Sequence, residues 1–126
     1  MPNYRRARTA GGTYFFTLVT HKRKPVFKHP DYRDALRQIV AEVRYEHPFA
    51  IDAWVLLPDH MHAIWTMHAD SSDYSMRWGL IKARFTKYIR QTDNSLVSRT
   101  ISIWQKRFWE HEIRDQKDLN NHIDYL

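Results

Sequence analysis

The sequence contains no cysteine, so disulfide scaffolds, thiolate zinc sites and cysteine nucleophiles are all excluded. Any bound metal must therefore use histidine, carboxylate or amide ligands. No apolar run approaches the roughly 20 residues that cross a bilayer, and the amino-terminal MPNYRRARTAGG lacks the apolar stretch of a signal peptide. We expect a cytoplasmic protein with no membrane partner.

What the chain does contain is the composition of one globular domain. Its 126 residues are 43% hydrophobic and 27% charged, which is enough to form one modest core and too apolar for a disordered chain. No repeat, low-complexity tract or linker interrupts it. We predict a single domain over residues 1–126, with residues 1–12 as a basic arm.

The net charge of +6 is distributed unevenly. Residues 1–28 hold seven basic and no acidic residues, and residues 76–107 hold eight basic residues against Asp93 alone. The segments between and after these blocks carry net negative charge. Two basic blocks with interleaved aromatic residues favour a polyanionic partner such as nucleic acid. A basic protein without such a partner is the alternative that charge leaves open.

Hydrophobic periodicity and turn residues predict alternating strands and helices. The expected strands are 14–20, 49–57, 60–67 and short segments at 101–104 and 106–113. The expected helices are one of about 16 residues from Asp31, one within 73–91, and a last one with Asp115 as N-cap. The order β-α-β-β-α-β-α, without glycine-rich phosphate loops, indicates an α+β fold of ferredoxin-like type. In such a fold an antiparallel sheet has helices packed on one face.

The predicted helix within 73–91 is amphipathic. Its apolar residues fall within one arc, and Arg84, Lys87 and Arg90 fall on the opposite side. These three cations are candidates for contacts to a phosphate backbone. A solvated outer face on a helix that packs against the core is an equally good interpretation.

The motif His60-Met61-His62 is the sharpest chemical feature. Residues i and i+2 of a strand point to the same side, so both imidazoles face one way while Met61 faces the other. Two convergent imidazoles form half of a metal site, which a third ligand can complete. By itself the motif is weak, and two histidines on a polar face are the simpler alternative.

Other histidine-based chemistries are disfavoured by the neighbouring residues. A histidine-triad hydrolase needs a third histidine where Ile64 stands, and a two-His-x-Thr phosphoesterase needs threonine where His62 stands. Cupin-like sites need further ligands on a longer all-β chain. What remains is a metal-dependent phosphodiester reaction in which the ion polarises the phosphate and a side chain supplies the nucleophile.

Four segments together carry a family resemblance. They occur in the order 54–65 (WVLLPDHMHAIW), 74–82 (YSMRWGLIK), 103–111 (IWQKRFWEH) and 122–125 (HIDY). In this order and at this spacing the chain resembles the REP-associated tyrosine transposases, which belong to the His-hydrophobic-His single-strand DNA transposases and nucleases. The resemblance runs from about Gly11 to the last residue.

The resemblance implies a ferredoxin-like catalytic domain in which His60 and His62 ligate Mg²⁺ or Mn²⁺. It also implies that Tyr125, on the last helix, attacks a DNA phosphate and leaves a 5′-phosphotyrosine link and a free 3′-OH. Family members continue past this tyrosine with a segment whose asparagine completes the metal site. This sequence stops at Leu126, so we expect the last helix to be truncated there.

The family's substrates are single-stranded repetitive extragenic palindromes that fold into hairpins, so the implied partner is hairpin DNA in the bacterial cytoplasm, associated with the nucleoid. On charge alone, Arg5, Arg6 and Arg8 join the candidate DNA contacts. The protein would act as a monomer or a homodimer. A non-catalytic or truncated relative that only binds hairpin DNA is the alternative function.

Several further residues have weaker assignments. Tyr14, Trp78 and Trp104 could stack on bases, but large aromatic residues in a domain of this size are usually needed in the core. No spacing ties His111 or His122 to the histidine pair, so both are interpreted as structural or surface residues.

Overall fold

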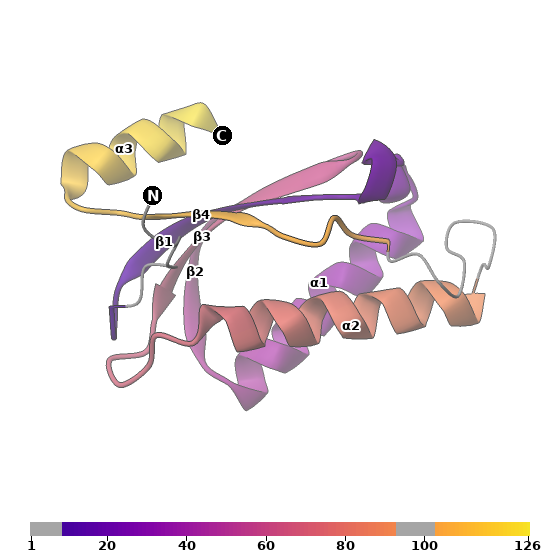
Figure 1. The fold of residues 1–126 in the computed structure, drawn as a ribbon, viewed down its shortest axis with the longest axis horizontal. Helices are drawn as coiled ribbons and strands as arrows, with labels where there is room; N and C mark the ends of the chain where they lie inside the picture. Colours follow the sequence, from indigo (N-terminus) through magenta and orange to yellow (C-terminus); the bar gives the residue numbers. More distant parts are fainter. Residues whose placement is uncertain (1–8, 93–102) are drawn as a thin grey trace, which may run out of the picture.

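The structure is a computed structural model that describes residues 9–92 and 103–126. It contains one four-stranded sheet and three α-helices (Figure 1). The elements are β1 (Thr13–Val19), η1 (His21–Arg23), η2 (Val26–Lys28), α1 (Pro30–Glu46), β2 (Phe49–Leu57), β3 (His60–Met67), α2 (Tyr74–Thr92), β4 (Trp109–Glu112) and α3 (Gln116–Tyr125).

The sheet has the strand order β2-β3-β1-β4, and every neighbouring pair is antiparallel. Strands β2 and β3 form a hairpin, while α1 and α2 each connect strands that are not adjacent. This topology confirms the predicted ferredoxin-like α+β fold. In the central pair, Thr17 lies opposite His62 and Val19 lies opposite His60, which fixes where the histidine motif sits.

One face of the sheet forms the core. Alternate residues of β1 and β3, including Phe16 and Trp65, are buried on this face beneath α1 and α2 (Figure 1). The rings of Trp65 and Trp78 stack with centroids 4.0 Å apart and an interplanar angle of 15°. The predicted core assignment of Tyr14, Trp78 and Trp104 is confirmed, since each is at most 2% exposed.

The third helix lies on the opposite face of the sheet (Figure 1). The ring of Phe15, which alternates with the core residues of β1, lies 4.8 Å from that of His122 and 6.1 Å from that of Tyr125. The expected placement of helices on one face therefore holds for α1 and α2 and differs for α3. The physical reason is that the first two helices already cover the core face, whereas Phe15 offers α3 an apolar partner on the other.

A buried arginine joins the start of α2 to the end of α1. Arg77 is 5% exposed, and its guanidinium donates hydrogen bonds to the carbonyl oxygens of His47 (2.9 Å), Pro48 (3.3 Å) and Asp73 (2.8 Å). Burial lowers its pKa from the ordinary value. Arg77 therefore links the loop after α1 to the residue before α2 through three backbone carbonyls.

The fourth strand is shorter than predicted. It begins at Trp109 rather than Lys106, and Trp104 forms only an isolated bridge with Thr20. Residues 101 and 102 of the expected preceding segment lie outside the described part of the chain. Among the helices that the structure describes, none is long and apolar enough to span a membrane.

Candidate active site

The two histidines of the motif lie side by side on the face of β3 that α3 covers. Their ring centroids are 5.1 Å apart, and between them Met61 points into the core, as strand alternation predicts. His62 is 6% exposed, whereas His60 is partly exposed. The pair is therefore open to solvent on the side of His60 and enclosed on the side of His62.

Each histidine is oriented through its Nδ1 atom. His60 Nδ1 donates to Asp59 Oδ1 at 2.7 Å, and His62 Nδ1 is hydrogen-bonded to Thr17 Oγ1 at 2.9 Å. Arg23 Nε donates in turn to Asp59 Oδ2 at 2.9 Å. Histidine ligands of metals are typically held in this way, by a partner on one ring nitrogen that leaves the other for the ion. The two Nε2 atoms are thus the candidate ligands.

The electrostatics favour the forms that bind a cation. Burial, with a smaller effect from His60, lowers the pKa of His62, so its imidazole stays neutral to lower pH than usual. Neutral imidazole is the form that ligates metals. The hydrogen bond from His60, followed by that from Arg23, lowers the pKa of Asp59. Asp59 therefore bears a negative charge behind His60, on the side away from its candidate ligand atom.

Tyr125 reaches the histidine pair from the last turn of α3. Its ring lies 5.2 Å from that of His62 at an interplanar angle of 72°, and the side chain is 69% exposed. The candidate nucleophile and one candidate ligand are thus brought together from elements that lie more than 60 residues apart. An exposed phenol beside a partly enclosed imidazole pair can be reached by a large substrate.

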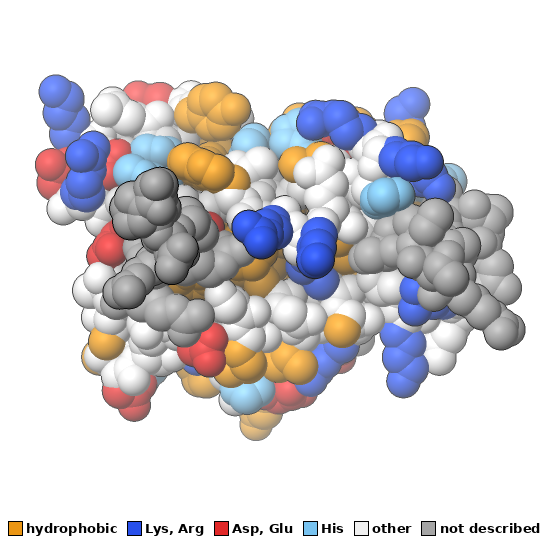
Figure 2. Space-filling view, in the orientation of Figure 1, with side chains coloured by type: hydrophobic (Ala, Val, Ile, Leu, Met, Phe, Trp, Pro, Cys, Tyr) orange, Lys and Arg blue, Asp and Glu red, His pale blue; other side chains and the backbone are white. Residues whose placement is uncertain are grey.

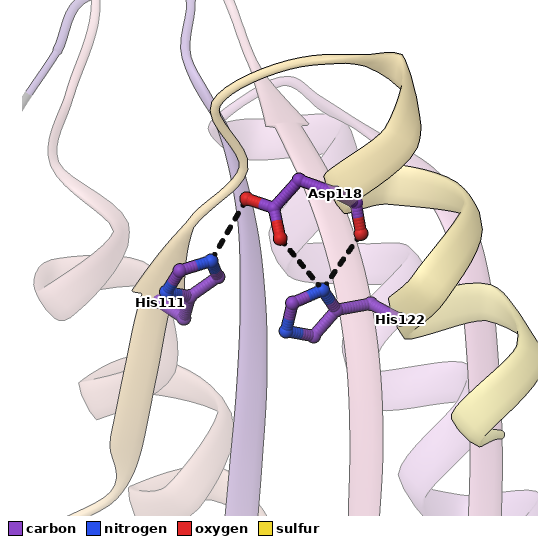
Figure 3. Close-up of side chains that lie close together, drawn as sticks. All are labelled: His111, Asp118 and His122. Carbon is purple, nitrogen blue, oxygen red and sulfur yellow. Dashed lines mark hydrogen bonds and ion pairs between the residues drawn. The ribbon is translucent and has the colours of Figure 1, made fainter.

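A network of polar side chains fastens the start of α3 to β4 (Figure 3). His111 Nε2 donates to Asp118 Oδ2 at 2.9 Å, and the backbone N–H of Arg114 donates to the same oxygen at 2.9 Å. His122 Nδ1 lies 2.8 Å from the carbonyl oxygen of Asp118 and 3.2 Å from its Oδ1. The rings of His111 and His122 stack with centroids 4.7 Å apart.

This cluster could hold a divalent ion, because its three candidate ligand atoms lie within 4.8 Å of one another. The buried carboxylate of Asp118, however, is already stabilised by hydrogen bonds from protein groups. The N–H of Arg114, followed by His111, holds the pKa of Asp118 far below its usual range. We interpret the cluster as the anchor of α3. Sequence reasoning missed it, although the spacing of Asp118 and His122 places them one helical turn apart.

A cavity of about 390 Å³ opens between α3 and the sheet. It is lined by Phe15, Thr17, Trp109, Asn121, His122 and Tyr125. Trp109 is 56% exposed, which is unusual for the largest apolar side chain. The cavity thus adjoins the candidate nucleophile and combines aromatic walls with an amide and a hydroxyl group.

The predicted DNA contacts are not gathered at this site. Arg84 of α2 is paired with Glu46 of α1 at 2.7 Å, on the side of the sheet opposite α3. This hydrogen bond lowers the pKa of Glu46. Lys87 and Arg90 are exposed on the same helix, α2. Arg5, Arg6 and Arg8 lie outside the described residues. All six assignments stay predictions.

A different basic surface borders the histidine pair. Lys22 and Arg23 both have left-handed backbone conformations, with φ of 54° and 52°, and Arg23 is tied to Asp59 beside His60. Backbone strain of this kind in non-glycine residues is concentrated at functional sites. Lys106 and Arg107 are exposed just after Gln105, whose N–H donates to Val19 at the end of β1. Figure 2 shows Lys, Arg and His side chains gathered toward the end of the molecule where β1 finishes.

Comparisons with known proteins point to one family. The family model for IS200-like transposases matches residues 9–126. The REP-associated tyrosine transposase of Escherichia coli K12 is 41% identical over 126 residues, which are all of this chain and 70% of the relative. A relative from Haemophilus influenzae is 40% identical over 131 residues, covering all of this chain and 74% of its own length.

A solved structure of a REP-associated tyrosine transposase bound to a REP hairpin superposes with a TM-score of 0.84. It is 40% identical, and the match covers 99% of this chain and 70% of that one. A Deinococcus radiodurans structure, 12% identical with a TM-score of 0.66, shares the fold. The chain therefore belongs to the IS200-like transposase family and, within it, to the REP-associated tyrosine transposases.

Proposed function

We propose that this chain is a metal-dependent single-stranded DNA endonuclease and strand transferase that acts on REP-type palindromic hairpins. The observation that carries the proposal is the approach of Tyr125 to His62, with 5.2 Å between their ring centroids. The solved relative bound to a REP hairpin supports the same class of substrate here.

In the proposed reaction, the hydroxyl oxygen of Tyr125 attacks the phosphorus of a DNA phosphodiester. The phenol gives up its proton, the bond from phosphorus to the 3′ oxygen breaks, and the leaving 3′ oxygen takes up one proton from the surrounding water, so the products are a 5′-phosphotyrosine and a free 3′-OH. A 3′-OH that later attacks this phosphotyrosine restores the phenol and completes strand transfer. Because a phenol has a pKa near 10, it is a poor nucleophile at neutral pH unless the phosphate is polarised.

The Nε2 atoms of His60 and His62 would hold the divalent ion in this proposal. The support is that both Nδ1 atoms already have hydrogen-bond partners and that burial lowers the pKa of His62. Imidazole ligands suit Mn²⁺ better than Mg²⁺, which prefers oxygen. When bound, the ion supplies positive charge that polarises the scissile phosphate.

The test of the reaction is covalent capture of DNA by the protein. A labelled single-stranded REP-type hairpin with its flanking tetranucleotide is incubated with Mn²⁺ or EDTA and resolved on a denaturing gel. We expect an adduct that needs the metal and is lost in Tyr125→Phe and in His60→Ala. Tyr45→Phe is the matched control, because Tyr45 is 90% exposed on α1, away from the histidine pair.

Each result of this assay has a distinct meaning. An adduct that survives Tyr125→Phe refutes the assigned nucleophile. An adduct that forms equally in EDTA refutes metal dependence. Hairpin binding without any adduct, in either metal condition, favours the alternative of a protein that only binds DNA.

We propose that the DNA backbone follows the basic turn near the histidine pair, and the contacts on α2 that charge predicts are the alternative that the following test decides. The support is that Lys22 and Lys106 each follow a residue whose backbone N–H is bonded near the end of β1, the strand that pairs with the histidines. Two double variants, Lys22→Gln with Lys106→Gln and Lys87→Gln with Arg90→Gln, remove equal charge. Fluorescence anisotropy across a salt series should show a slope reduced by about 1.4 for the first pair only, at roughly 0.7 per phosphate contact.

A further inference from the structure

Two of the exposed aromatic side chains in the described part of the chain lie at the cavity beneath α3. Among the described residues, the large hydrophobic side chains with high exposure are Tyr45, Trp109, Ile123 and Tyr125. Trp109 and Tyr125 line the cavity, and Ile123 lies between cavity-lining residues of the same helix. Two exposed aromatic side chains that share one cavity form an apolar surface of the kind that binds a ligand, whereas Tyr45 stands alone on α1.

The shape and composition of the cavity indicate what this ligand is. Its volume of about 390 Å³ is within the range of small-molecule sites, and Phe15 forms its floor on the sheet. Trp109 meets Phe15 edge to face, with centroids 6.0 Å apart, and lies parallel to the ring of His111 at 6.1 Å, yet it remains 56% exposed. A flat aromatic ligand that enters from solvent can therefore stack on Trp109.

The polar groups of the cavity suit the edge of a nucleobase. The Asn121 amide offers both a donor and an acceptor, the pairing that reads the edge of an unpaired base. No Lys, Arg, Asp or Glu side chain is among the lining residues, and the imidazole of His122 is already held through Nδ1 by the carbonyl oxygen of Asp118, so the walls favour a neutral ligand. A neutral heteroaromatic ring satisfies both conditions.

We propose that this cavity, the Trp109 pocket, binds one unstacked nucleobase of single-stranded DNA next to the phosphate that Tyr125 attacks. This inference rests on the proposed function and names a subsite of the same substrate. Stacking on Trp109 supplies the affinity, Asn121 supplies selectivity among bases, and the base held there places its phosphate between Tyr125 and the histidine pair. The pocket thereby couples recognition of a nucleotide to the position of cleavage.

The experiment is a cycle that combines protein variants with abasic nucleotides. Single-stranded REP-type hairpins carry one abasic site at each flanking nucleotide in turn, and affinity is measured by anisotropy. All proteins carry Tyr125→Phe, which keeps the ring in the pocket wall and removes the hydroxyl, so binding is measured without cleavage. Trp109→Ala is compared with Trp109→Phe, which retains a stacking face, and with Tyr45→Ala as the matched exposed aromatic on α1.

We expect one abasic position to weaken binding by roughly 5- to 100-fold with Trp109 present and by less than twofold in Trp109→Ala, as expected for lost base stacking. Trp109→Phe should restore most of the coupling, and Tyr45→Ala should leave it intact. Asn121→Ala should level the preference among the four bases at that position.

Two results would overturn the pocket. In the first, Trp109→Ala weakens binding of the intact hairpin and of every abasic hairpin by the same factor. In the second, Trp109→Ala does not weaken binding of any hairpin. The adduct gel, run with the chain that keeps Tyr125, tests the reaction itself. An adduct without coupling refutes the pocket alone, and coupling without an adduct refutes the cleavage proposal alone.

Discussion

Replacing Asp118 with asparagine should release α3 from β4 without unfolding the core. The carboxylate accepts hydrogen bonds from His111 at 2.9 Å and from the backbone N–H of Arg114 at 2.9 Å, and the side chain is 8% exposed. Both donors reach Oδ2, where an asparagine can keep its one acceptor oxygen, but its N–H₂ group then replaces Oδ1 beside His122 Nδ1. The charge that strengthens both hydrogen bonds is also lost.

The expected loss is about 2 kcal/mol, because hydrogen bonds to a buried charged group contribute roughly 1.5–3 kcal/mol. At 1.4 kcal/mol per tenfold change, amide protection over residues 113–126 should fall about 30-fold. Hydrogen exchange read by mass spectrometry measures this change directly. The strands β1 and β3 should keep their protection, since α3 covers only the face opposite the core.

Asp124→Asn is the matched control, because Asp124 is exposed on the same helix and should change protection little. The pH dependence provides a second check. Since the folded pKa of Asp118 is depressed, its stabilising effect is complete above about pH 5 and is lost as pH falls through that lowered value. Equal exchange in the wild type and Asp118→Asn at neutral pH would refute the anchor, as would a loss spread evenly over the sheet.

Three further predictions concern the helix layer. Arg77→Met removes the guanidinium that bonds the carbonyls of His47, after α1, and Asp73, before α2. The free energy of unfolding should fall by about 3 kcal/mol and Tm by roughly 10 °C in calorimetry. In Arg84→Gln, the carboxyl of Glu46 loses its main hydrogen bond, so NMR should show its titration midpoint rising toward the ordinary value. Trp78→Ala removes the ring stacked on Trp65 and should cost about 3–5 kcal/mol in denaturant unfolding.

Much of the fold could be predicted because local signals agree with the global topology. The limits of β2 and β3 match the prediction, since the turn at Pro58-Asp59 separates two apolar runs. Strand β4 was predicted too long because its pairing depends on β1. Tyr14–Thr17 pair with it in register, but the next bridge joins Thr20 to Trp104, which sets five residues of this segment against three of β1. The residues between therefore bulge out of the ladder, and such a register shift is not visible in sequence periodicity.

The candidate site was only partly predictable. Strand alternation places His60 and His62 on one face, whereas the position of Tyr125 came from the family resemblance and not from any pattern in the chain. Helical periodicity identifies an apolar stripe but not which face of a sheet receives it. For the same reason Trp109 escaped notice, since an aromatic residue on an edge strand can face either the core or solvent.

The anchor and the candidate nucleophile occupy opposite ends of the same helix, and this arrangement links stability to chemistry. Asp118 and Tyr125 are seven residues apart, which at 1.5 Å per residue separates them by about 10 Å along the axis. A helix fixed near one end moves most at the other, so a small rotation at Asp118 displaces the phenol by a much larger amount. Because in-line attack tolerates little displacement, loosening the anchor should reduce adduct formation more steeply than hairpin binding. Asp118→Asn assayed by both methods tests this, and an equal loss in the two assays would show that α3 moves as a binding element and not as a carrier of the nucleophile.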